Sequence, residues 1–192
     1  MNKLKKLFIT TISIIIIFSQ YSCQNKNKRS QRITIASSGK IESLDPARVN
    51  TLKSYQLLNA LGDTLYEINR EGVLTPKLAA SMPLISEDKL KIIIKLKQNI
   101  SFHDGTSFDS SAMKFTIERF QNIGTMNYIL DKKIKSIETP HKELLIINLN
   151  KPASSLEGLL TSINLTAISP SFYKNNFNNF LNDKFVGTGK YK

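Results

Sequence analysis

The 192-residue chain has only two histidines, and one of them, His103, stands beside an aspartate in the stretch SFHDGTSFD at residues 101–109. A histidine next to a carboxylate could serve acid–base or nucleophilic catalysis, provided that a nucleophile or a metal lies within reach. Adjacent residues at a strand end point to opposite faces, so His103 and Asp104 cannot pair with each other. The dipeptide Asp-Gly is instead a strong turn signal. We therefore interpret this stretch as a turn.

Other catalytic patterns are incomplete. There is no GxSxG nucleophile motif, and two isolated histidines without clustered partners do not make a zinc site. The glycine-rich end, VGTGKYK at 186–192, fails as a phosphate-binding loop because Lys184 stands at its first glycine position and Tyr191 at its Ser/Thr position. We interpret it as a glycine-rich turn entering a strand. The sequence therefore predicts a protein that is not an enzyme and has neither a metal nor a cofactor.

The composition predicts a folded protein with an unusual charge. Hydrophobic residues make up 41% and charged residues 22% of the chain, which is typical of a domain with a core. The net charge of +12 raises the question of nucleic acid as a partner. The lysines are spread along the chain, however, with no basic helix, no zinc spacing and no RNA-binding signature, so we expect no nucleic-acid binding.

The first 22 residues have the layout of a signal peptide. A positive start is followed by an uncharged apolar run, Leu7–Phe18. As a helix this run would be roughly 18 Å long, too short for a hydrocarbon core of about 30 Å. We predict that residues 1–22 form a signal peptide.

The only cysteine, Cys23, follows this segment directly. Ser22 and Cys23 resemble the bacterial lipoprotein signal, in which the thiol is lipidated, although Gln20 and Tyr21 depart from it. We predict lipidation of Cys23, and residues 23–31 as a lipid-anchored flexible tether. Ordinary cleavage and an uncleaved signal anchor remain the alternatives. A single cysteine leaves no disulfide within the chain.

Residues 32–192 show mixed α and β patterns. Residues 32–37 predict a short strand, and Thr51 can cap a helix whose apolar face carries Leu58, Leu61 and Leu65. Alternating apolar and charged residues predict a half-buried strand at 90–97.

The second half of this region repeats both kinds of pattern. Asp109 can cap a helix with apolar residues at 113, 117 and 120. Residues 143–149 predict another strand, joined to the preceding residues in a hairpin that turns around Pro140 and His141. The fold class is α+β.

Five segments in order resemble one family: LDPARVN at 44–50, the stretch 61–81, the stretch 87–120, AISPSFY at 167–173 and FVGTGKYK at 185–192. Together they are similar to the N-terminal part of the extracellular solute-binding proteins of the peptide, oligopeptide and nickel ABC-transporter family. Met82 departs from the family, which usually has tryptophan there. The resemblance implies that residues 32–192 form a partial solute-binding domain. It would be the N-terminal portion of the first lobe of a two-lobed periplasmic-binding-protein-like fold, truncated relative to longer family members.

The resemblance also implies a function. The protein would be the substrate-binding component of an ABC importer, or a fragment of one. It would capture peptides or a similar small solute at the periplasmic or extracellular face of the bacterial cytoplasmic membrane and deliver them to permease subunits. An arginine of nickel-type relatives is absent at 165–167, so nickel is the less expected solute. Tyr128 would offer a stacking face. The implied ligand-binding residues are Ser37, Ser38, Gly39, Val49, Asn50, Met126, Tyr128 and Thr166.

Two other functions stay open. The chain could be an inactive remnant or one half of a split gene, in which case a second polypeptide would supply the missing lobe, or it could be a structural or interaction lipoprotein. The DNA downstream of the last codon would discriminate between a split gene and a remnant. We expect one lobe alone not to bind a peptide tightly, because small-ligand pockets typically bury about 70 to 90% of their ligand.

Overall fold

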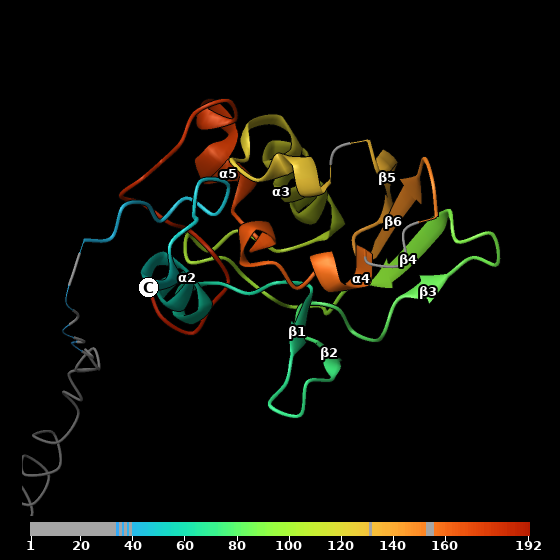
Figure 1. The fold of residues 1–192 in the computed structure, drawn as a ribbon, viewed down its shortest axis with the longest axis horizontal. Coiled ribbons are helices and arrows are strands. Elements are labelled where there is room, and N and C mark those ends of the chain that lie inside the picture. Colours follow the sequence, from blue (N-terminus) through green and yellow to red (C-terminus); the bar gives the residue numbers. More distant parts are fainter. Residues whose placement is uncertain (1–33, 35, 37, 39, 131, 153–155) are drawn as a thin grey trace, which may run out of the picture. The chain divides into compact units, whose positions relative to one another are not determined.

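The structure, a computed structural model, describes residues 34, 36, 38, 40–130, 132–152 and 156–192 (Figure 1). The chain divides into two units, residues 1–39 and 40–192. All helices and strands of the described residues belong to the second unit. The predicted signal peptide, Cys23 and the tether lie outside the described residues.

A four-stranded antiparallel sheet forms the centre of the second unit. Its order is β3-β4-β6-β5, with bounds Leu84–Ile85, Lys91–Lys95, Leu144–Leu149 and Ile134–His141 respectively. In β4 the buried side chains Ile92 and Ile94 alternate with the exposed Lys91 and Lys95 and the half-buried Ile93, which fits the predicted half-buried strand. In register, Ile92 faces Ile147 and Ile94 faces Leu145. One face of the sheet is therefore apolar.

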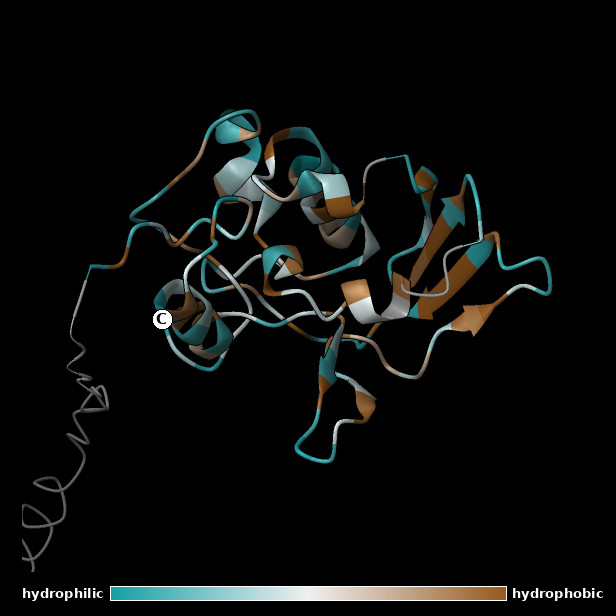
Figure 2. Cartoon of the chain, viewed as in Figure 1, coloured by the Kyte–Doolittle hydropathy of each residue, from teal (hydrophilic) through white to brown (hydrophobic). Residues whose placement is uncertain are grey.

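Helix α3, Ser110–Ile123, packs on β5 and β6. Its N-cap is Asp109, whose carboxylate accepts a hydrogen bond from the Ala112 amide at 2.9 Å. Met113, Ile117 and Phe120 are at most 1% exposed and lie in the same cluster as the sheet's apolar side chains. Figure 2 shows the strands of the sheet largely in the hydrophobic colour. The core thus lies between α3 and the sheet.

The other elements extend this body. Helix α2, Leu52–Leu61, is capped by Thr51 as predicted, and it ends at Gly62, so that Leu65 is buried but lies beyond the helix. Strands β1 (Tyr66–Ile68) and β2 (Leu74–Pro76) pair in a separate hairpin. One short helical turn, η2 (Asn127–Ile129), lies between α3 and β5 in the chain. Four more follow β6: α4 Leu156–Leu159, η3 Ile163–Leu165, α5 Pro170–Tyr173 and η4 Lys174–Asn176. Within the described ranges, no helix is long and apolar enough to cross a membrane.

The predicted hairpin at residues 134–149 exists, but its turn was misplaced. Strands β5 and β6 turn at Lys142 and Glu143, whereas Pro140 and His141 remain in β5. The register shifts between Glu138 and His141. Because β5 is an edge strand with a bulge, Pro140 can lack an N–H without breaking the ladder.

Two other predicted strands differ from the structure. Of the predicted strand at 32–37, the structure describes only Thr34 and Ala36. Neither residue is in a strand. Residues 185–192 do not form a strand either. The Gly189 amide donates to the Leu61 carbonyl at 3.0 Å, so this segment crosses closely over the end of α2 as a loop.

Candidate functional site

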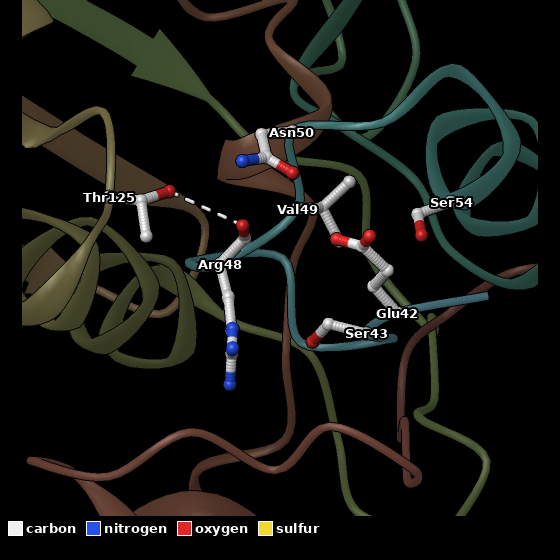
Figure 3. A pocket seen from close by; sticks show the side chains of 7 residues that line it. All are labelled: Glu42, Ser43, Arg48, Val49, Asn50, Ser54 and Thr125. Atoms are coloured by element: carbon white, nitrogen blue, oxygen red, sulfur yellow. Dashed lines mark hydrogen bonds between the residues drawn. The ribbon is translucent and has the colours of Figure 1, made fainter. Parts of the chain in front are cut away.

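The loop from Ser43 to Asn50, called the pocket loop below, forms one wall of a pocket of about 220 Å³ (Figure 3). It connects the first described residues of the second unit to α2 and contains Pro46, which restricts its backbone. The lining residues come from this loop, from its preceding residue, from α2 and from the segment after α3: Glu42, Ser43, Arg48, Val49, Asn50, Ser54 and Thr125.

The pocket carries both signs of charge. Glu42, Arg48 and Asn50 are exposed, whereas Ser43 and Ser54 are buried. Figure 3 shows the Arg48 guanidinium extending away from Glu42. That guanidinium donates from Nη1 to Oδ1 of Asn182 at 3.1 Å. Such a pocket suits a polar solute with hydrogen-bonding and charged groups better than an apolar one.

A buried ion pair holds the pocket loop from behind. Asp45 is 0% and Arg119 of α3 is 1% exposed. Arg119 donates from Nη1 to Oδ1 at 2.8 Å and from Nη2 to Oδ2 at 2.6 Å, a bidentate geometry. The carboxylate also accepts the amide of Ala47 at 3.0 Å and that of Leu181 at 2.8 Å. This one side chain therefore joins the pocket loop, α3 and the segment near residue 181.

Tyr173 lies beside the ion pair. Its ring centroid is 5.0 Å from the guanidinium carbon of Arg119. Burial, and secondarily the negative charge of Asp45, raise the pKa of the Tyr173 phenol well above its usual value. The Tyr173 phenol is therefore neutral. Its aromatic ring packs against the Arg119 guanidinium in a cation–π contact.

The structure brings some of the predicted ligand-binding residues together. Val49 and Asn50 line the pocket. Met126 follows the lining residue Thr125 and accepts a hydrogen bond from the Tyr55 hydroxyl at its Sδ atom, at 3.8 Å.

The others do not line this pocket. Tyr128, in η2, is 65% exposed. Thr166 is 0% exposed, and its hydroxyl donates to the Ile163 carbonyl at 2.6 Å. Ser38 is exposed and belongs to the first unit, while Ser37 and Gly39 lie outside the described residues.

Sequence reasoning did not predict five of the lining residues as ligand contacts: Glu42, Ser43, Arg48, Ser54 and Thr125. The signal that could have helped is the segment LDPARVN, which resembles the family and contains both Val49 and Asn50. Neither Ser54, which looks like an ordinary polar helix residue, nor Thr125 carries such a signal.

The His103–Asp104 stretch is a turn, which confirms the interpretation from sequence. Gly105 has a φ of +85°, a conformation that favours glycine. The Phe102 amide donates to the Thr106 carbonyl, and the Gly105 amide donates to the Phe102 carbonyl, which closes the turn. His103 Nε2 donates to the Gly189 carbonyl at 2.8 Å. The imidazole therefore holds the glycine-rich end of the chain and does not face Asp104.

The Asp104 carboxylate instead accepts hydroxyl hydrogen bonds from other segments. Its donors are Thr106 at 2.6 Å, Ser169 at 2.5 Å and Ser171 at 2.8 Å. Partial burial would raise the pKa of Asp104, but these bonds, with the Thr106 amide, outweigh it and lower the pKa to about 2. The turn is thus fastened to the start of α5.

A second hollow, of about 400 Å³, is lined by none of the predicted ligand-binding residues. It lies beside the Ser101–Ser107 bridge, and its lining, from residues 97–101, 107–109 and 142–143, is polar apart from Ile100 and Phe108. Within the part of the chain that the structure describes, no group of three or more histidine, cysteine, aspartate or glutamate side chains could hold a metal ion.

The sequence and the fold both match part of the bacterial extracellular solute-binding proteins. The model of the bacterial extracellular solute-binding proteins, family 5 (middle region), matches residues 73–192, so the chain belongs to this family. The resemblance stated from the five sequence segments is confirmed. The mixed helix-and-sheet body superposes on part of periplasmic binding proteins, which confirms the fold class.

Individual relatives cover most of this chain. The glutathione-binding protein GsiB of Escherichia coli O1:K1 is 27% identical over 164 residues, which are 84% of this chain and 32% of GsiB. The structure of NikZ from Campylobacter jejuni in complex with Ni(L-His) is 27% identical, with a TM-score of 0.69, and covers 80% of this chain and 31% of NikZ. Listeria monocytogenes OppA bound to peptide, 20% identical with a TM-score of 0.71 over 80% of this chain and 34% of OppA, shows the fold alone. The chain thus spans about a third of the length of these relatives.

Proposed function

We propose that this chain supplies part of the ligand-binding lobe of a solute-binding protein that captures a peptide or a similar small polar solute for an ABC permease. The observation that carries the proposal is the pocket behind Val49 and Asn50, two residues that the family resemblance implied as ligand contacts. Family membership supports the same function. The protein would not act as an enzyme.

The chemistry of the pocket favours a peptide. Glu42 can accept an ammonium group, Arg48 can donate to a carboxylate, and Asn50 can bond to an amide. Within the described part of the chain, neither the Glu42 carboxylate nor the Asn50 amide has a hydrogen-bond partner, so both are available to a solute. GsiB is named for glutathione and OppA is bound to peptide, and both ligands contain these groups. Nickel stays the less expected solute, although NikZ carries a nickel–histidine complex.

The proposal places the protein outside the cytoplasmic membrane, held by a lipid on Cys23. Capture at that face would allow direct delivery to permease subunits. A further lobe would cover the solute from the other side, and a second polypeptide is one way to supply it. We expect the lobe described here to bind a solute weakly, because an open pocket of about 220 Å³ leaves most of a peptide in water.

Weak binding of this kind can be located by NMR. We would titrate the ¹⁵N-labelled chain with glutathione and with a short peptide and follow the amide resonances. The expected result is a set of concentration-dependent shifts confined to residues 42–54 and 125. Asn50→Leu should weaken the response, whereas Gln98→Leu in the second hollow is the matched control and should not.

The result also separates the alternatives. Shifts around Gln98 instead of Asn50 would mean that the solute binds in the second hollow, and they would contradict the proposed site. No shift with any peptide, together with well-dispersed spectra of a folded chain, would favour the remnant or the interaction lipoprotein.

A further inference from the structure

The pocket loop is held from inside by one buried amide, that of Asn164 in η3. Its Nδ2 donates to the Pro46 carbonyl at 2.7 Å and to the Val49 carbonyl at 2.8 Å. Asn164 is 4% exposed and does not line the pocket. An asparagine amide has two N–H hydrogens, and here both are used on the same loop.

This arrangement fixes the loop at two points three residues apart. The Asn164 oxygen accepts from the Ser162 hydroxyl at 3.4 Å, which is consistent with the nitrogen facing the loop. The reverse orientation would set an acceptor against two carbonyl oxygens and leave them unsatisfied in a buried place. The peptide planes after Pro46 and after Val49 are therefore held in one orientation.

The carbonyls between these two points are occupied as well. Those of Ala47 and Arg48 accept from the Thr125 hydroxyl at 3.4 and 3.3 Å, and the Ala47 carbonyl also accepts the Thr125 amide at 2.9 Å. Four successive backbone carbonyls, those of residues 46–49, thus accept hydrogen bonds from Asn164 or Thr125. In the same stretch, the exposed side chains Arg48 and Asn50 line the pocket together with the buried Val49.

Resting on the function proposed above, we infer that Asn164 is a positioning residue of the solute pocket, which sets its affinity without touching the solute. The Asp45–Arg119 ion pair holds the same loop, but it also joins α3 and the segment at 181, so its loss affects the whole body. Asn164 is neutral, and in the described structure its amide nitrogen bonds only to the loop. Its removal should therefore loosen the pocket locally.

The test compares Asn164→Leu with Thr116→Val in the full chain. Both substitutions nearly preserve shape, and both remove hydrogen bonds of a buried polar side chain to backbone. Thr116 is 3% exposed, donates to the Ala112 carbonyl at 3.0 Å and accepts the Ile168 amide at 3.2 Å. It is the matched control for a general loss of stability.

Hydrogen exchange measured without solute gives the first readout. Asn164→Leu should speed exchange of the amides at 47–49 and 125 about fivefold for each hydrogen bond lost, the factor that a typical net hydrogen-bond contribution of about 1 kcal/mol corresponds to. Exchange in β4 and β6 should stay unchanged. Thr116→Val should lower the melting temperature similarly and leave 47–49 protected. Equal exchange at 47–49 in the two variants, or a uniform increase throughout the chain, would overturn the inference.

The peptide titration gives the second readout. Asn164→Leu should weaken the pocket response at least tenfold, and Thr116→Val should leave it near that of the native chain. Unchanged affinity in Asn164→Leu would also overturn the inference. If the native chain binds no peptide, the proposed function fails, while the exchange comparison still decides whether Asn164 positions the loop.

Discussion

Breaking the buried ion pair from the arginine side should be the most damaging single change in the described body. Arg119→Met keeps a long unbranched side chain in the same space but removes the guanidinium. The Asp45 carboxylate would keep the amides of Ala47 and Leu181 and lose both of its charged donors. A carboxylate that is 0% exposed would then be left without a counter-ion.

The expected cost follows from this geometry. Removing one partner of a buried pair typically costs about 3–5 kcal/mol, because the remaining charge stays desolvated. For a domain of this size, each kcal/mol lowers the melting temperature by about 2–4 °C, so we expect a decrease of about 6–20 °C. Replacing both partners, as in Asp45→Leu with Arg119→Met, should recover only part of this loss. The amides of Ala47 and Leu181 would then lack an acceptor, at about 1–3 kcal/mol each.

Thermal and urea unfolding followed by circular dichroism measure the effect. The control on the same helix is Lys114→Met, which breaks the exposed Lys114–Glu118 pair at 3.7 Å. That substitution should cost less than about 0.5 kcal/mol, because exposed pairs are screened by water. Equal losses for Arg119→Met and Lys114→Met would refute the reasoning, as would full recovery in the double variant.

Three further predictions address the anchor, the glycine-rich end and acid stability. Cys23→Ala should release the protein from membranes, and a variant that stays bound, with no lipid on the native chain by mass spectrometry, would favour a signal anchor. Gly189→Ala should cost about 1–3 kcal/mol in urea unfolding, because its Cβ would lie 2.3 Å from the Leu61 carbonyl carbon, whereas Gly158→Ala, with open space, should be near neutral. The Asp104 pKa of about 2 lies below its ordinary 3.8, so the carboxylate contributes stability above pH 3.8 that is lost as the pH falls through 2. Melting temperatures between pH 5 and 2 should therefore fall less steeply in Asp104→Asn than in the native chain, and parallel curves would contradict this.

The elements that sequence predicted well depend on near neighbours. Thr51 and Asp109 cap their helices by bonding amides three residues ahead, so the information for each cap is local. The alternation around Ile92 and the helical spacing around Ile117 likewise repeat within a few residues. The misplaced turn at Pro140 has the opposite origin. Whether a proline ends a strand depends on whether that strand lies at a sheet edge, and the edge is set by the partners of the sheet.

The ion pair behind the pocket could not be predicted in this way. Asp45 and Arg119 are 74 residues apart, and Asp45 also bonds to Leu181, 136 residues away. From the sequence, Asp45 looks like a loop carboxylate and Arg119 like a solvated position on a helix, because charged residues are seldom buried. Only the tertiary fold makes them partners.

The same reasoning separates two groups of residues in the candidate site. Side chains that line the pocket, such as Val49 and Asn50, lie in a segment that resembles the family, so sequence comparison can indicate them. The side chains that give this segment its shape, Arg119 and Asn164, lie in α3 and η3 and touch the loop only through its backbone carbonyls and one buried carboxylate. Such contacts constrain the conformation of the loop but not the side chains it presents. Solute preference could therefore change among relatives by substitution at positions 48 and 50 while the anchors stay the same.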